Sequence, residues 1–80
     1  MAMEYFTATS LRRGRIYLDG NYLGENREGE LPRVFCCPPG LHDICFEFLN
    51  HGAWHRHTRR LRIAGTTRIL PLDIPFICAL

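Results

Sequence analysis

Apolar and polar residues alternate along much of this chain, and the alternation predicts short strands separated by turns. The clearest case covers residues 42–49, because successive side chains on a strand point to opposite faces of a sheet. One face of this segment is apolar and the other is mainly polar: Ile44, Phe46 and Phe48 against Asp43, Cys45 and Glu47. This spacing predicts a central strand of a sheet.

Residues 14–24, with the sequence G-R-I-Y-L-D-G-N-Y-L-G, predict a β-hairpin. Ile16 and Leu18 fall on one face of its first strand, since they are two residues apart. The Asp-Gly-Asn step at residues 19–21 predicts a tight turn, because glycine tolerates positive φ and short polar side chains bond to nearby backbone. We therefore expect two short antiparallel strands here.

Four further segments are predicted as strands: residues 4–10, 33–37, 55–63 and 67–74. The first is expected at a sheet edge, whereas residues 33–37 are apolar enough on both faces for a sheet interior. Pro71 places the last strand at an edge or at a bulge, because proline has no N–H for the ladder. The same strand is predicted to present three residues to one face: Leu70, Leu72 and Ile74.

The other stretches predict turns, a loop and a tail. Glycine and proline predict turns at residues 38–40, 50–54 and 64–66. The charged run E-N-R-E-G-E at 25–30 predicts a surface loop, and the apolar residues 75–80 are expected to cover the open end of the core. No window shows a helical apolar pattern. The fold class is therefore all-β, a small antiparallel β-sandwich of six to seven short strands or a barrel, with no substantial helix.

Length and charge narrow the possibilities further. Eighty residues predict one domain, 1–80, and the 46% hydrophobic content is ordinary for a globular fold. Ten basic residues, all arginine, stand against eight acidic ones. A net charge of +2 is too small to indicate a nucleic-acid partner by itself. The first residues do not resemble a secretory signal, and the apolar run at 69–80 is too short to span a membrane, so we expect a cytoplasmic protein.

Four cysteines, Cys36, Cys37, Cys45 and Cys78, allow two disulfides in three connectivities. All four lie in apolar, strand-like runs, where a free cysteine behaves as a small hydrophobic residue. We therefore expect free thiols, as in a reducing compartment.

Two segments together resemble the PEGA domain family. Residues 14–24 are similar to its first hairpin, and P-P-G-L-H-D-I-C-F at 38–46 is similar to the turn and strand that follow. Six positions match the family pattern: Asp19, Gly20, Gly24, Pro38, Gly40 and Leu41. Pro39 departs from it, because the family has glutamate there, and the Thr-Pro step expected after Gly24 is absent. The resemblance implies a small, non-enzymatic β-sandwich that serves as a binding module.

The most conspicuous candidate site is the arginine-rich run at residues 55–62. On a strand, Arg56, Arg60 and Arg62 share one face, with Trp54 at its root as a stacking or anchoring aromatic. This face would meet an acidic protein surface or nucleic-acid phosphates. The alternative is a solvated face, on which these arginines pair with Asp43 and Glu47 of a neighbouring strand.

Other chemistry has less support in the sequence. His55 and His57 could bind a metal with His51, His42 or a cysteine, but no established ligand spacing accompanies them. No nucleophile motif, phosphate-binding loop or cofactor signature is present, so we expect no enzyme activity, no cofactor and no metal. The acidic loop offers a second contact site for a basic partner through Glu25, Glu28 and Glu30.

These observations favour a non-enzymatic protein-protein interaction module. The alternative is a stand-alone small inhibitor or adaptor, of mobile-element or phage type, that docks on a nucleic-acid-processing complex through the arginine-rich strand. Direct nucleic-acid binding is a less favoured expectation. Dimerisation by strand pairing is a further option if residues 4–10 or 67–74 form an exposed edge.

Overall fold

The computed structural model describes residues 2–77 and shows an all-β chain without a helix in that range, as predicted. The strands are β1 (Glu4–Thr9), β2 (Arg15–Leu18), β3 (Asn21–Glu25), β4 (Arg27–Glu28), β5 (Leu31–Pro32), β6 (Phe35–Cys37), β7 (Gly40–Asn50), β8 (Ala53–Ile63) and β9 (Leu72–Pro75). Two of them, β4 and β5, have two residues each and pair with one another.

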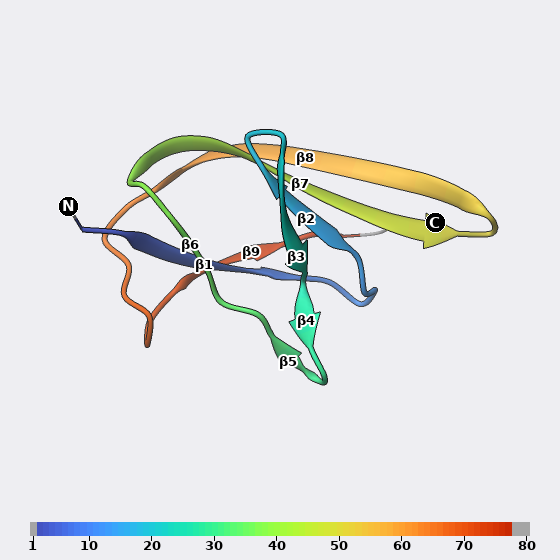
Figure 1. Cartoon of the computed structure of the whole chain (residues 1–80), viewed down its shortest axis with the longest axis horizontal. Coiled ribbons are helices and arrows are strands. Elements are labelled where there is room, and N and C mark those ends of the chain that lie inside the picture. Colours follow the sequence, from blue (N-terminus) through green and yellow to red (C-terminus); the bar gives the residue numbers. More distant parts are fainter. Residues whose placement is uncertain (1, 78–80) are drawn as a thin grey trace.

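Two sheets form the layers of a small sandwich-like fold (Figure 1). The larger sheet has the order β3-β2-β7-β8 and the smaller has the order β6-β1-β9. Their facing sides enclose one hydrophobic cluster: Phe6, Ala8, Ile16, Phe35, Cys37, Ile44, Phe46, Phe48, Ile63, Ile74 and Phe76. The predicted alternation of β7 is confirmed, because Ile44, Phe46 and Phe48 are each fully buried.

The predicted hairpin at residues 14–24 is confirmed as β2 and β3. Asp19 and Gly20 form its turn with φ values of +48° and +88°, the left-handed pair that a two-residue hairpin turn requires. Gly14 precedes β2 and lies against β7. A Cβ there would stand 2.4 Å from Phe46 Cε1 and 2.5 Å from the Glu47 carbonyl oxygen, so only glycine fits.

The smaller sheet corrects the prediction for residues 4–10. β1 is its central strand rather than an edge, because it pairs with β6 on one side and with β9 on the other. The pairing with β9 is parallel and joins Phe6 to Leu72 and Ala8 to Ile74. Local sequence cannot show this contact, because the two strands lie at opposite ends of the chain.

Residues 67–74 form a shorter strand than predicted. The Thr67 backbone N–H donates to the Leu70 carbonyl and the Thr67 hydroxyl accepts from the Leu70 N–H, which makes a local turn instead. Leu70 precedes the strand and is 75% exposed, whereas Ile74 is 1% exposed, so the predicted common face of Leu70, Leu72 and Ile74 is wrong for Leu70. β9 begins at Leu72, after Pro71, and lies at a sheet edge as expected.

The acidic segment 25–30 is not a simple surface loop. Asn26 is 1% exposed, and β4 begins at the next residue. The Asn26 Oδ1 accepts a hydrogen bond from the Gly14 N–H at 2.9 Å, and the Asn26 Nδ2 donates to the Arg12 carbonyl at 3.0 Å. A buried amide with both ends bonded anchors the small β4–β5 hairpin to the start of β2.

Residues 33–37 also differ from expectation, because β6 is an edge strand with one exposed face. Cys36 is exposed and Cys37 is buried; both are free thiols, as is Cys45. Burial raises the pKa of Cys37 to about 11. Cys78, also predicted to be free, lies outside the described residues.

The end of the chain contributes to the core, as the apolar pattern predicted. Phe76 is 4% exposed and its ring centroid lies 5.4 Å from that of Phe46, whereas Ile77 is 82% exposed. Residues 78–80 of the predicted tail lie outside the described part. Within residues 2–77, no helix is long and apolar enough to cross a membrane.

Candidate functional site

The candidate site is the outer face of the larger sheet, the side turned away from the core. The register of its strands places these side chains on one surface: Arg15, Tyr17, Tyr22, Leu41, Asp43, Cys45, Glu47, Leu49, Trp54, Arg56, Thr58, Arg60 and Arg62. The smaller sheet packs against the opposite, apolar side. Aromatic and arginine side chains are therefore gathered on a surface that remains exposed.

The arginine-rich strand pairs with β7 as the solvated-face alternative predicted. Arg60 lies opposite Asp43 and donates to both of its carboxylate oxygens, at 2.8 and 3.3 Å. Arg56 lies opposite Glu47 and donates to Oε2 at 3.1 Å. The bonds from Arg60 lower the pKa of Asp43 and raise that of Arg60 itself.

Glu47 is the centre of a polar network on this face. Besides Arg56, it accepts a 3.1 Å hydrogen bond from the Tyr17 hydroxyl and lies 3.6 Å from Arg15. The Arg56 guanidinium also stands over the Tyr17 ring, at 5.6 Å from its centroid. The Glu47 side chain is only 15% exposed, and its contacts join Tyr17, Arg15 and Arg56 in one polar network.

Trp54 lies at the tip of the β7–β8 hairpin, opposite Leu49. The Arg15 guanidinium covers its ring at 4.2 Å from the centroid, so Trp54 stacks on a residue of its own sheet, and its predicted contact with a partner stays a prediction. Trp54 is 49% exposed and Leu49 is 53% exposed. They form an apolar end of the outer face, next to the charged centre.

Arg62 differs from the other two predicted arginines. It lies opposite Leu41, which is 54% exposed, and it has no ion pair with any residue of the described chain. A cation without a carboxylate partner in its own sheet is available to an external carboxylate. Of the three predicted arginines, Arg62 therefore has the most free bonding capacity within the described chain.

The histidines considered as metal ligands have a structural role on the inner side. The rings of His55 and His57 stack on Phe48, with centroid distances of 5.3 and 5.9 Å. Nearby, Arg59 donates to the Pro75 carbonyl at 3.0 Å. No three His, Cys, Asp or Glu side chains in residues 2–77 are grouped so that they could hold a metal ion.

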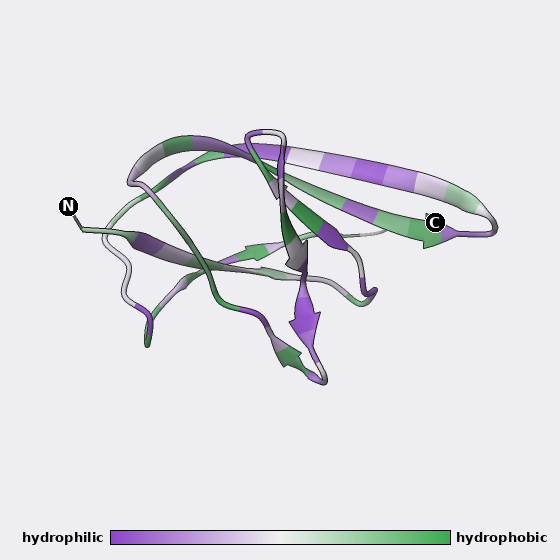
Figure 2. Cartoon of the chain, in the orientation of Figure 1, coloured by the Kyte–Doolittle hydropathy of each residue, from purple (hydrophilic) through white to green (hydrophobic). Residues whose placement is uncertain are grey.

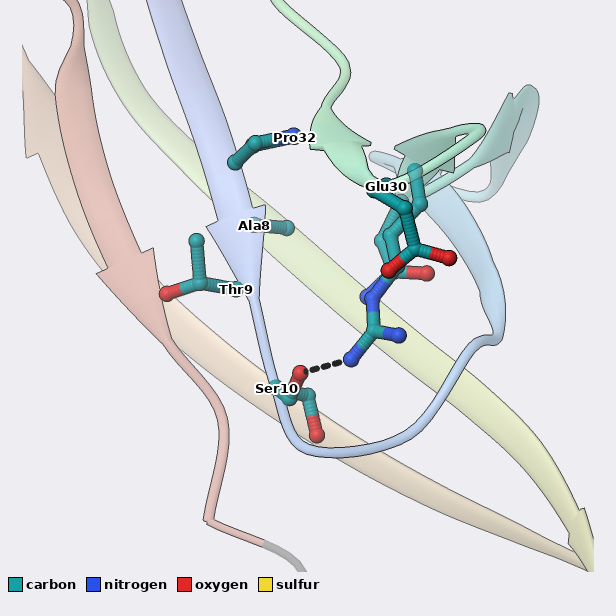
Figure 3. A pocket seen from close by; sticks show the side chains of 7 residues that line it. Ala8, Thr9, Ser10, Glu30 and Pro32 are labelled. Carbon is teal, nitrogen blue, oxygen red and sulfur yellow. Dashed lines mark hydrogen bonds between the residues drawn. The ribbon is translucent and has the colours of Figure 1, made fainter.

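The three acidic residues predicted as a second contact site have different surroundings. Glu25 pairs with Arg13 at 3.3 Å, and Glu28 lines an open hollow of about 580 Å³ that also contains Arg33 and Arg68. Glu30 lines a second hollow of about 300 Å³ on the side of the β4–β5 hairpin, with Ala8, Thr9 and Ser10 on the side of β1 (Figure 3). They therefore do not make a single acidic site.

Sequence reasoning missed the aromatic and basic residues that β2 and β3 add to this face. Tyr17 and Tyr22 lie opposite one another with ring centroids 5.5 Å apart, and Tyr22 is 57% exposed. Arg15 and Tyr17 are two residues apart, so period-two alternation places both on the side of β2 opposite Ile16 and Leu18. It could not show that this side continues the arginine-rich face, because that depends on β2 pairing with β7.

Comparison with protein-family models, curated proteins and solved structures finds no match to this chain. The resemblance to PEGA domains therefore stays a prediction.

Proposed function

We propose that this chain is a non-enzymatic protein-protein interaction module that binds its partner through the outer face of the larger sheet. The observation that carries the proposal is the composition of that face. Trp, Tyr and Arg are the residues that dominate binding energy in protein interfaces. Here they form a continuous surface of two tyrosines, one tryptophan and arginines, which are partly ordered before any partner arrives.

The arrangement also suits a protein partner better than a phosphate backbone. Arg56 and Arg60 already share carboxylates with the sheet, so the charge of the face is partly compensated. Nucleic-acid binding without sequence preference depends on uncompensated positive charge. An apolar end at Trp54 and Leu49 beside a charged centre is the usual mixture of a protein interface.

The proposal is tested by affinity capture from the native host with wild-type protein and matched variants. Trp54→Ala and Tyr22→Ala should lower recovery of the partner, and Arg56→Glu combined with Arg62→Glu should abolish it. Ile69→Ala is the matched control, because Ile69 is 88% exposed and does not belong to the outer face. Equal partner recovery by all of these folded proteins would contradict the proposal.

The inhibitor or adaptor role is one form of this function, with a nucleic-acid-processing complex as the partner. The same experiment addresses it, because nuclease treatment of the lysate separates a protein contact from a nucleic-acid bridge. Partner recovery that survives nuclease treatment and falls with Arg62→Glu would support direct docking through β8.

A further inference from the structure

The free edge of β8 carries backbone N–H and C=O groups that the ion pairs of the outer face do not use. β8 is the last strand of the larger sheet and has eleven residues, and in the described part of the chain it pairs with β7 alone. It runs along the border of the molecule, and within residues 2–77 no strand pairs with the side that faces away from β7 (Figure 1). An uncovered strand of this length offers a row of backbone donors and acceptors to another chain.

The hairpin geometry identifies which backbone groups point outward. The turn at His51 and Gly52, with φ values of +52° and +76°, makes Asn50 and Ala53 the closing hydrogen-bonded pair of a two-residue hairpin. From this pair the ladder alternates between bonded and non-bonded positions. The outward-pointing groups then belong to alternate residues of β8: Trp54, Arg56, Thr58, Arg60 and Arg62.

One contact supports this alternation of bonded and non-bonded positions independently of the turn. The Asp43 carbonyl accepts a 2.9 Å bond from the Asp19 N–H, which lies on the side of β7 away from β8. Asp43 is therefore at a non-bonded position of the β7–β8 ladder, and its partner Arg60 turns its own backbone groups outward. No backbone group of the five outward residues has a hydrogen-bond partner within residues 2–77.

The charge of β8 selects the kind of strand that this edge would accept. Its sequence A-W-H-R-H-T-R-R-L-R-I has four arginines and no acidic residue, and most of the strand is hydrophilic (Figure 2). The Arg56 and Arg60 side chains are 61% and 68% exposed despite their ion pairs. Each guanidinium has five N–H donors, so both can bind a second carboxylate. Arg62 has no ion pair among residues 2–77.

A second copy of this chain fits the edge poorly. Antiparallel pairing of β8 with itself about Thr58 would place Arg56 opposite Arg60 and Trp54 opposite Arg62. Like charges directly opposite one another destabilise a sheet. An acidic strand reverses the sign of these contacts.

We propose that β8 accepts an extended acidic segment of a partner protein as an added antiparallel strand. This inference rests on the proposed function and specifies the form of the partner. Carboxylates at the first, third and seventh positions of the segment would meet Arg62, Arg60 and Arg56, and an apolar residue at its ninth position would meet Trp54. The backbone bonds supply affinity, and the alternate side chains supply specificity.

The probe is a synthetic nine-residue peptide with glutamate at its first, third and seventh positions, phenylalanine at its ninth, and threonine or valine between them. Binding is measured by fluorescence anisotropy with the intact chain. A scrambled peptide of the same composition controls for charge alone. A version N-methylated at two of the glutamates keeps the charge and loses two backbone donors, so we expect binding weaker by about tenfold or more.

Thr58→Pro provides the matching change in the protein. The N–H that it removes points outward, so the ladder with β7 stays intact and proline is tolerated at this edge position. Peptide binding should be lost while the circular dichroism spectrum is kept. Thr58→Val, which retains the N–H and suits a strand, is the control and should bind as wild type does.

The outcomes separate this inference from the proposed function. Equal binding of the parent and N-methylated peptides, or unchanged binding by Thr58→Pro, would overturn strand addition. If strand addition failed in this way but Trp54→Ala and Tyr22→Ala still lowered partner recovery, the proposed function would be supported without strand addition. Tighter binding of a single-stranded RNA oligonucleotide than of the acidic peptide would also overturn the inference.

Discussion

Replacement of Asp19 by asparagine isolates one ionic contact in the β2–β3 turn. Asp19 Oδ2 lies 2.6 Å from His42 Nδ1, and His42 Nε2 lies 2.7 Å from the Pro38 carbonyl oxygen. Both ring nitrogens face oxygen acceptors, which suits the imidazolium because it donates from both. Asparagine tolerates the left-handed backbone at this turn and can still accept the Asp43 N–H bond. The variant therefore removes the charge opposite His42 and keeps the turn.

The size of the effect follows from the exposure of the two side chains. A hydrogen bond to a charged group contributes about 1.5–3 kcal/mol. His42 is 11% exposed, but Asp19 is 46% exposed, and solvent screening reduces the contribution of such a pair. We expect Asp19→Asn to lower the free energy of unfolding by about 1 kcal/mol at pH 6, a fall in Tm of about 4–8 °C for a domain of this size.

The pH dependence gives the prediction its sign. The Asp19 hydrogen bond raises the pKa of His42 above its ordinary value, so its stabilisation is complete below the unfolded value, about pH 6.5, and is lost as pH rises through the raised pKa. Hydrogen bonds from the Asp43 N–H and His42 lower the pKa of Asp19. The stabilisation that ionised Asp19 contributes is therefore lost only as pH falls through that lowered pKa. The loss caused by Asp19→Asn should therefore be greatest between about pH 4 and pH 6.5 and smaller at pH 9.

Urea unfolding followed by far-ultraviolet circular dichroism at pH 6 and pH 9 measures both values. Asp73→Asn is the control, because Asp73 accepts bonds from Thr7 and Thr9 and has no hydrogen bond or ion pair with a histidine of residues 2–77. The loss of unfolding free energy caused by Asp73→Asn should not change between pH 6 and pH 9 through histidine titration. An equal loss for Asp19→Asn at pH 6 and pH 9 would refute the assignment of an imidazolium to His42.

Two other predictions concern buried groups. Asn26→Ala should lower the free energy of unfolding by about 2–4 kcal/mol, because it leaves the buried Gly14 N–H and the partly buried Arg12 carbonyl unpaired. Urea unfolding measures this loss, and a value below that of Asp19→Asn would contradict the anchoring role. Iodoacetamide at pH 8 should alkylate exposed Cys36 in the folded protein and leave Cys37 unmodified, because Cys37 is buried and its pKa is raised to about 11. Peptide mapping by mass spectrometry distinguishes the two, and urea should remove the protection of Cys37.

The pattern of the sequence determined the strands whose pairing is local. Alternation identified β7, and the Asp-Gly turn identified the β2–β3 hairpin. The pairs of Arg56 with Glu47 and Arg60 with Asp43 were among those expected, because a short turn between two alternating strands restricts the register to a few choices. The arginine-rich candidate site could therefore be predicted in outline from residues 42–63 alone.

Only the tertiary structure decided what depends on contacts between distant segments. The parallel pairing of β9 with β1 made the predicted edge strand a central one, and the burial of Asn26 turned an expected loop into an anchored hairpin. The pairing of β2 with β7 joined Tyr17 to the arginine-rich face. Local alternation shows which side chains share a face of one strand, but which strands share a sheet, and which edge stays free, depends on how the whole chain buries its apolar surface.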